Sequence, residues 1–351
     1  MKIAIHHREG SFSDSDFSYN KRWIAYCKEQ NISYKLVDAY KNNIIEQIAN
    51  CDIFMWHFYQ NSTKDFLFAK QLFASIEAAG KLVFPSLAMT WHFDDKVAQK
   101  YLLEAIEAPL VESYVFYDEK EALAWLEKTA IPLVFKLRGG AGSQNVKLLK
   151  TKDVVKQHIR KAFRKGFSQY DGFSILKDRF QKFTKGKDTF KGVLHAFVRL
   201  LYPTTYAKVK GRDKGYIYFQ KFIPNNDTDT RVIVIGKRAF AIKRKVREND
   251  FRASGGGFII YDSNEIDIQT VKISFDISKK LTLDCVAFDF VFDEKNNPLI
   301  VEISYGFAIE AYDPCPGYWD DQLNWHKGSF NPQAWMIDDL IEKIAPSFDN
   351  V

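Results

Sequence analysis

Residues 285–306 read CVAFDFVFDEKNNPLIVEISYG, two apolar stretches separated by a polar turn. This pattern predicts two antiparallel strands joined by a short loop. Asp289 lies in the first strand and Glu302 in the second, so pairing would bring their carboxylates together. An acidic side chain on a half-buried strand needs a positive partner. Mg²⁺ is one candidate, because it takes carboxylate oxygens and leaves positions for phosphates. A salt bridge to Lys or Arg is the other.

The composition is that of a globular protein. The chain has 351 residues, 46% hydrophobic and 27% charged, which is enough for two or three subdomains. No apolar run approaches the roughly 18–20 residues that cross a bilayer, and the N-terminus MKIAIHHREG lacks the features of a signal peptide. The four cysteines (Cys27, Cys51, Cys285 and Cys315) form no CxxC pair, so we expect reduced thiols in a cytoplasmic protein.

Positive charge is concentrated in one segment. The chain carries +6 overall, but residues 151–215 hold 17 Lys and Arg against 5 Asp and no Glu, a net +12 that leaves −6 for the remainder. Such a segment attracts phosphates, an acidic glycan, nucleic acid or a membrane surface, or is an ordinary solvated surface. Nucleic acid is disfavoured, because no helix-turn-helix, zinc-finger or RNP pattern accompanies the charge.

The first ninety residues alternate between strand and helix patterns. The predicted strands cover residues 2–7, 33–37, 52–56 and 81–85, and the helices cover 18–30, 42–49 and 66–79. This alternation predicts a small α/β unit with a parallel sheet. His6, His7 and His57 would lie at the carboxyl ends of its strands, where such units bind ligands, although they are equally compatible with simple strand ends.

A Gly-rich turn follows the predicted strand at 132–137. Residues 134–146 read VFKLRGGAGSQNV, and glycines let the backbone approach a ligand and turn its N–H groups toward an anion. Lys136 would add a point charge for phosphate oxygens. The segment is not a Walker A loop, because GxxxxGK[ST] is absent, and a plain tight turn remains the alternative.

Two further segments carry charge beside a turn. Residues 219–231 read FQKFIPNNDTDTR, which places Asp229 and Arg231 at the start of a strand. Residues 241–257 then run from AIKR to NDFRASGGG, where Arg252 precedes a Gly triplet that suits an anion clamp on a loop. Each segment taken alone is also compatible with an ordinary surface.

Taken in order, these segments resemble the ATP-grasp superfamily. The order is Asp95-Lys96, the Lys136 loop, the 219–231 segment, the 241–257 segment and the Asp289…Glu302 pair. The same order is found in the ribosomal-protein glutamate ligases and glutathione-synthetase-like carboxylate–amine ligases of that superfamily. The resemblance covers about residues 91–307. The resemblance implies an α/β fold, α+β in the ATP-grasp part. An N-terminal pre-ATP-grasp domain (1–92) would precede a central and lid subdomain with the basic insertion (93–215) and a C-terminal subdomain with the metal site (216–351). The last two would clasp ATP between them.

The resemblance also implies roles for single residues. In nucleotide binding, phosphates would be held by Lys96, Lys136 and the loop with Gly140, Gly142 and Ser143. Adenine would lie on the hinge strand, formed by Gln220, Lys221 and Phe222. The remaining nucleotide contacts would come from Asp229, at the ribose, and from Arg244 and Ser254. The catalytic residues would be Arg252, which faces the γ-phosphate, Arg231 and Lys136. The metal ligands for Mg²⁺ or Mn²⁺ would be Asp289, Glu302 and Ser304.

Two regions depart from the family pattern. Ser304 occupies a position where the family usually has Asn, and the shorter, neutral ligand would weaken a second Mg²⁺ site. The tail at 312–326 has no counterpart in the ligases. Its Tyr312, Tyr318, Trp319 and Trp325 suit sugar faces or the packing of a core.

The resulting hypothesis is an ATP- and Mg²⁺-dependent carboxylate–amine ligase that acts through an acyl phosphate. Its partners would be a carboxylate, such as an acidic sugar, a glycan intermediate or an amino acid, and an amine, with no nucleic acid and no membrane span. The alternatives are an ATP-grasp kinase that phosphorylates a hydroxyl and a non-catalytic nucleotide-binding module. The oligomeric state stays open, a homodimer being one option.

Overall fold

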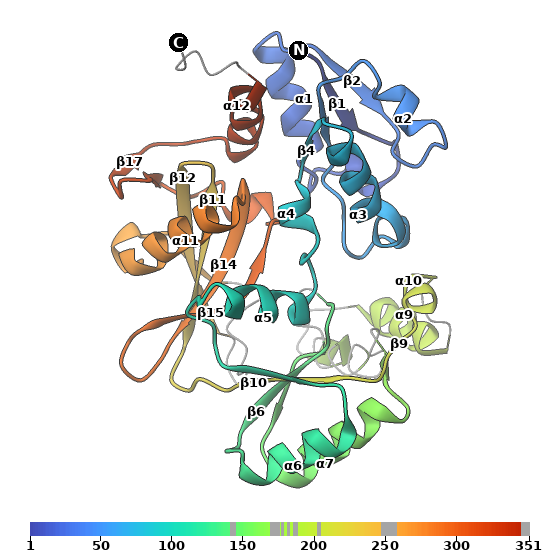
Figure 1. Cartoon of the computed structure of the whole chain (residues 1–351), viewed down its shortest axis with the longest axis vertical. Coiled ribbons are helices and arrows are strands. Elements are labelled where there is room, and N and C mark those ends of the chain that lie inside the picture. Colours follow the sequence, from blue (N-terminus) through green and yellow to red (C-terminus); the bar gives the residue numbers. More distant parts are fainter. Residues whose placement is uncertain are drawn as a thin grey trace.

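The computed structural model describes residues 1–140, 145–168, 176, 179–180, 183–184, 189–201, 205–246 and 258–344. Figure 1 shows three parts stacked along the long axis: an N-terminal unit at one end, a large sheet in the middle and a small sheet at the other end. None of the helices in these ranges is long and apolar enough to cross a membrane.

The N-terminal unit is a parallel sheet with helices, as the alternating pattern predicted. Its strand order is β2 (Tyr34–Val37), β1 (Ile3–His6), β3 (Ile53–Met55) and β4 (Leu82–Phe84), and every pair is parallel. Its helices are α1 (Asn20–Glu29), α2 (Ile44–Gln47), α3 (Thr63–Ala78) and the short α4 (Leu87–Thr90). All four residues of β1 are buried, which is typical of a parallel strand covered on both faces.

The small sheet is antiparallel and is covered by two helices. Its order is β5 (Ser113–Phe116), β10 (Ile217–Lys221), β6 (Leu133–Lys136) and β7 (Lys147–Leu149). Helices α6 (Glu119–Lys128) and α7 (Lys152–Phe163) pack on one face and bury a separate core with Leu126, Phe135, Ile159 and Phe219. Strand β10 pairs with β5 and β6, and the chain leaves this sheet after Lys221, the last residue of β10, to enter the large sheet.

The large sheet is antiparallel and carries the predicted hairpin. Its order is β15 (Pro298–Ser304), β14 (Cys285–Phe292), β11 (Thr228–Ile235), β12 (Arg238–Lys245), β16 (Gly317–Asp320) and β17 (Trp325–Lys327), with β13 (Ile259–Ile260) beside β12. Helix α11 (Ile268–Leu281) packs on this sheet, and α12 (Pro332–Ile344) contacts both β11 and α1 of the N-terminal unit. The tail residues Tyr312 and Trp319 are buried in the core of this part, 3% and 6% exposed.

The remaining elements connect the three parts. Helix α5 (Lys96–Ala105) links the N-terminal unit to the small sheet. Within the basic segment, β8 (Phe167–Ser168) pairs with β9 (Arg212–Asp213), and two helices, α9 (Phe190–Leu201) and α10 (Thr205–Lys210), precede β9. Single 3₁₀ turns form at η1 (Phe12–Asp14), η2 (Ser263–Glu265) and η3 (Ile309–Ala311).

Candidate functional site

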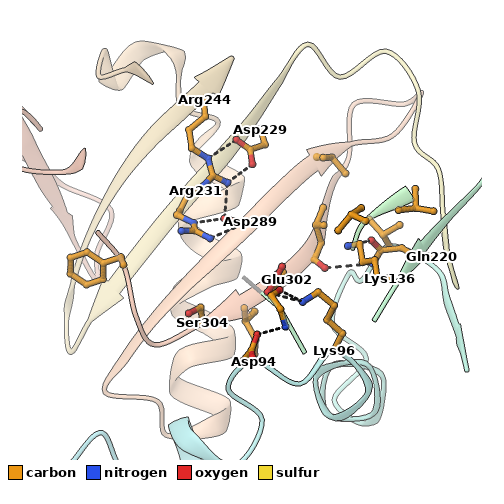
Figure 2. A pocket seen from close by; sticks show the side chains of 18 of the residues that line it. Asp94, Lys96, Lys136, Gln220, Asp229, Arg231, Arg244, Asp289, Glu302 and Ser304 are labelled. Carbon is orange, nitrogen blue, oxygen red and sulfur yellow. Dashed lines mark hydrogen bonds and ion pairs between the residues drawn. The ribbon is translucent and has the colours of Figure 1, made fainter. Parts of the chain in front are cut away.

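A cavity of about 1330 Å³ lies where the three parts meet. The small sheet contributes Lys136 and Gln220, and the large sheet contributes Asp289 and Glu302. The N-terminal unit closes one end with side chains from its loops, among them His57. Figure 2 shows that the charged side chains of these elements point into the same space.

Strand pairing places Asp289 and Glu302 side by side. They are direct partners in the β14–β15 register, so both side chains lie on the same face of the sheet. A β-bulge follows: Phe290 pairs with Ile300, which leaves Val301 as the extra residue. Bulges re-aim side chains, and here residues 301–304 all line the cavity. The two predicted carboxylates therefore meet at the cavity wall.

Asp289 is held by two arginines. Arg231 is its direct partner across the β11–β14 pair and donates from Nε (2.5 Å) and Nη2 (2.8 Å). Arg244 Nη2 lies 3.1 Å from Asp289 Oδ1. Arg244 also donates through Nε (2.8 Å) and Nη2 to Asp229, its direct partner across the β11–β12 pair. Asp229 and Arg231 are two residues apart on β11, so their side chains lie on the same face of the sheet. Asp229, Arg244, Asp289 and Arg231 therefore form one continuous row of charges (Figure 2).

The two carboxylates of the row differ in their pKa values. Burial alone would raise the pKa of Asp289, but the charges of Arg231 and Arg244 lower it to about 2. Burial raises the pKa of Asp229 to about 6, against the opposing effect of its bond to Arg244. The salt bridge that the sequence left open for Asp289 is thus present, and any metal at this position must share the carboxylate with two guanidinium groups.

Lys96 enters the cavity from the first turn of α5. Asp95 caps this helix by accepting from Ala98 N, and the cap places Lys96 beside the end of β15. Its Nζ lies 3.5 Å from Glu302 Oε1 and donates to Gly140 O (2.9 Å). Burial opposes the charge, but Glu302 and Asp94 raise the pKa of Lys96, so this lysine stays charged.

Lys136 has a different environment. It is 6% exposed, and its Nζ donates to Gln220 Oε1 at 2.6 Å. Among the described residues, no carboxylate lies within ion-pair distance of this Nζ, and burial lowers its pKa to about 8. A buried ammonium bound to a neutral amide and facing a cavity is suited to a ligand that brings negative charge.

The predicted hinge borders the cavity at the end of β10. Phe222 and Ile223 line the cavity, and so does Lys221, whose side chain is exposed and pairs with Glu112 (3.7 Å). Gln220 is buried and connects Lys136 to Ser113, to which its Nε2 donates at 3.1 Å. This segment offers the cavity an apolar wall and backbone groups, and its role in binding adenine stays a prediction.

The Gly-rich loop is described only at its first residues. Gly140 lines the cavity with φ 124°, a backbone conformation that favours glycine, and its N–H donates to Asp94 Oδ1 at 2.8 Å. The predicted site residues Gly142, Ser143, Arg252 and Ser254 lie outside the described residues.

Ser304 lines the cavity but uses its hydroxyl locally. The hydroxyl donates to Gly306 O (3.0 Å) and accepts from Gly306 N (3.2 Å). Among the described residues, no group of three or more Asp, Glu, His or Cys side chains is placed to hold a metal ion. Asp289 and Glu302 therefore fit a divalent cation that arrives with phosphate oxygens better than a free cation.

Residues outside the predicted site complete the cavity. Asp94 pairs with Lys210 of α10 (3.7 Å) as well as with Gly140. His57 stacks on Tyr19 with ring centroids 3.7 Å apart, and its Nδ1 accepts from Tyr19 N (3.2 Å). The neutral ring therefore carries its proton on Nε2, and burial lowers the pKa of His57 to about 3.

Two aromatic side chains stand at the same end. Phe12 and Tyr59 line the cavity and stack with their ring centroids 4.4 Å apart. The sequence carries a weak signal for His57, which follows a predicted strand, and none for this pair, because Phe12 begins the short η1 turn and Tyr59 lies in a loop.

Comparison with known proteins identifies the fold. Residues 205–313 match the family model of the RimK-like ATP-grasp domain. A comparison with curated proteins found no match. Among solved structures, a RimK-domain ATP-grasp protein from Sphaerobacter thermophilus aligns over 97% of this chain and 100% of its own, with 13% identity and a TM-score of 0.54.

Two ligases align as extensively. D-alanine–D-alanine ligase from Bacillus anthracis, solved in complex with ATP, covers 98% of this chain and 97% of its own, with 12% identity and a TM-score of 0.57. The ATP-grasp ligase PsnB, complexed with a minimal precursor, covers 97% and 98%, with 14% identity and the same TM-score. Residues 205–313 thus match a RimK-like ATP-grasp domain, and the whole chain shares the fold of these ATP-grasp structures, in agreement with the order of its motifs.

Proposed function

We propose that the cavity binds ATP with Mg²⁺ and that the protein is an ATP-dependent ligase, which joins a carboxylate to an amine and releases ADP and phosphate. The observation that carries the proposal is the cation Lys136 in the cavity wall. Its ammonium group is buried and has only a neutral partner, Gln220, among the described residues, whereas Lys96, Arg231 and Arg244 pair with carboxylates. A buried cation without a counter-charge favours a ligand that brings negative charge, such as a polyphosphate. Two of the similar structures are ligases, which supports the same reaction class.

The described residues divide into holding and positioning groups. Lys136 and Lys96 would hold phosphate oxygens, and the Phe222–Ile223 wall would receive the adenine. Asp289 and Glu302 would hold Mg²⁺, which when bound neutralises phosphate charge and acts as a Lewis acid. Arg231 and Arg244 keep Asp289 ionised and oriented for that role.

The chemistry then needs no side-chain nucleophile. A carboxylate oxygen of the substrate attacks the γ-phosphorus, the bond to the bridging oxygen breaks and ADP leaves. The amine nitrogen attacks the acyl carbon of the resulting acyl phosphate, phosphate leaves, and the nitrogen loses a proton. The protein contributes by alignment and by charge neutralisation, with Arg252 assigned to the transferred phosphoryl group by the family pattern.

The carboxylate substrate would lie at the N-terminal end of the cavity. His57 presents Nε2–H there, and the stacked pair of Phe12 and Tyr59 offers a flat apolar surface. Tyr312 and Trp319 of the tail are buried and do not line the cavity. Phe12 and Tyr59 would therefore provide the surface for a sugar or another flat substrate.

A screen of carboxylate and amine pairs, including uronic acids and amino acids, tests the proposal. ADP release that requires both substrates, with an amide product by mass spectrometry, is the expected result. A phosphorylated product without an amine would instead establish a kinase. Tight ATP binding with no ADP release from any pair would favour the non-catalytic module.

A further inference from the structure

Helix α9 exposes its apolar face. Phe190, Leu194, Phe197 and Val198 recur at the spacing of one helical face, and they are 67%, 50%, 50% and 46% exposed. A surface helix of a globular protein turns this face toward the core. The ring of Phe183 lies 6.1 Å from that of Phe190 and is also exposed, which extends the apolar surface beyond the helix.

Helix α9 also carries basic residues. Lys191 and His195 are exposed and lie at the border of the apolar face, each one position after an apolar residue of that face. The helix belongs to the segment 151–215, whose net charge is +12 while the rest of the chain carries −6. Exposed Phe and Leu beside Lys191, within a segment rich in Lys and Arg, are the composition of helices that lie in the plane of an anionic bilayer.

Charge and length decide between the candidate occupants of this face. A second copy of the chain would bring two segments of +12 together, and their repulsion opposes pairing through α9. The 12 residues of α9 extend over about 18 Å, too short for a hydrocarbon core of about 30 Å, so the helix cannot span a bilayer and would rest on its surface.

The same segment reaches the cavity. Helix α10, three residues after α9, packs against α3, and Lys210 at its end pairs with Asp94 in the cavity wall (Figure 1). A bilayer under α9 would therefore lie one short helix away from the site.

We propose that α9 is a membrane-surface anchor that binds anionic lipid through its exposed apolar face and the basic residues of its segment. This inference does not depend on the reaction that the cavity catalyses. It predicts binding to vesicles of phosphatidylglycerol and phosphatidylcholine (1:1), at least tenfold weaker binding to pure phosphatidylcholine, and loss of binding as salt is raised.

A site-specific probe gives the sharpest test. All four cysteines are buried, so a polarity-sensitive dye on Leu194→Cys labels one position. Its emission should shift to the blue with anionic vesicles, while the same dye on Ile45→Cys, an equally exposed position in α2, should not respond. No shift at residue 194, or equal shifts at both positions, would overturn the proposal.

Matched variants complete the test. Phe190→Ser/Leu194→Ser/Phe197→Ser should lower vesicle affinity at least tenfold, whereas Leu36→Ser/Ile45→Ser, which removes exposed apolar side chains elsewhere, should leave it unchanged. Circular dichroism melts check that both variants fold, and the labelled Leu194→Cys protein keeps the test valid if the triple variant does not fold.

Two outcomes would contradict the assignment. Binding to anionic vesicles that is as strong in the triple variant as in the wild type is the first. The second is a sedimentation mass that falls from dimer to monomer in the triple variant, which would make α9 a contact between copies.

Discussion

Arg231 holds the carboxylate of Asp289 with two parallel hydrogen bonds, from Nε at 2.5 Å and from Nη2 at 2.8 Å. Bidentate pairs of an arginine with a carboxylate are strong and directional. Arg244 adds a third cationic contact at 3.1 Å. Asp289 is therefore a structural residue as well as a candidate metal ligand, whereas Glu302, whose side chain is 29% exposed, has Lys96 as its one ion-pair partner in the described part of the chain.

The two carboxylates should consequently differ in what they contribute to stability. Asp289→Asn leaves the half-buried Arg231 and Arg244 facing a neutral group, and we expect the free energy of unfolding to fall by about 3 kcal/mol. Glu302→Gln keeps a hydrogen-bond acceptor beside Lys96 and should cost about 1 kcal/mol. Urea unfolding of the Asp289→Asn and Glu302→Gln variants measures both losses of free energy. Equal losses would show that the arginine row does not hold Asp289 in solution.

Magnesium alone should bind weakly, because both candidate ligands already face cations in the free protein. We expect no change in melting temperature with millimolar Mg²⁺, but a clear rise with ATP and Mg²⁺ together, about 2.7 kcal/mol of added stability at a ligand concentration of 100 times Kd. Glu302→Gln serves as the control, since this variant should have the same melting temperature with ATP and Mg²⁺ as with ATP and EDTA. A rise with Mg²⁺ alone would mean that the arginines move aside without a nucleotide.

The affinity for ATP should depend on pH through Lys136. Burial lowers the pKa of this lysine to about 8, below the usual value of 10.5, so the free protein loses the charge as pH rises above 8. Phosphates favour the charged form, so ATP binding must recover a proton there, and affinity should fall by up to tenfold per pH unit. Lys96 stays charged over this range because its pKa is raised.

Calorimetry with a non-hydrolysable ATP analogue from pH 7 to pH 10 checks this dependence. Lys136→Arg, which keeps its charge throughout, should flatten the profile. The sign for folding is the opposite: because the folded pKa is depressed, the free protein should gain stability from this group as pH rises from about 8 to 10.5. An identical ATP profile in wild type and Lys136→Arg would exclude Lys136 as the titrating group.

Arg252 tests the part of the site that rests on the family pattern alone. If it stabilises the phosphoryl group in transfer, Arg252→Ala should lower kcat by a hundredfold or more and change ATP affinity little. The measurement needs the substrate pair from the screen and separate determination of kcat and of the Kd for ATP. Equal losses in both would indicate a role in ground-state binding.

The sequence predicted those parts of the molecule that depend on local pattern. Alternating strand and helix signals identified the parallel sheet of the N-terminal unit, and the CVAFDFVF and PLIVEIS stretches identified β14 and β15. The hairpin also predicted that the two carboxylates come close together, but a register continued without a break from the pair of Phe290 and Ile300 would place Asp289 opposite Val301. The direct pairing of Asp289 with Glu302 depends on the bulge at Val301, which the sequence pattern does not encode. The order of the motifs added the resemblance to ATP-grasp proteins, which the family model supports over residues 205–313 and which local pattern alone does not provide.

What the sequence could not predict depends on contacts between distant segments. The choice between metal and salt bridge at Asp289 required the registers of β11 against β12 and β14, which place Arg231 and Arg244 beside it. The cavity end at His57 depends on the N-terminal unit meeting β15 and the loop after it. The bond from Tyr19 Oη to Phe307 O joins residues 288 positions apart, and no periodic pattern encodes such a contact.

His57 should recognise the carboxylate substrate by donating a hydrogen bond, without taking part in proton transfer. Its pKa, lowered by burial to about 3, keeps the ring neutral between pH 5 and pH 8, and the Tyr19 N–H on Nδ1 leaves the proton on Nε2. His57→Phe removes this donor, and we expect KM for the carboxylate to rise about tenfold with the Kd for ATP unchanged. His57→Gln retains an N–H donor and should recover part of the loss. A titration between pH 5 and pH 8 in the wild-type kcat profile that His57→Gln abolishes would contradict a neutral donor and point to acid–base catalysis instead.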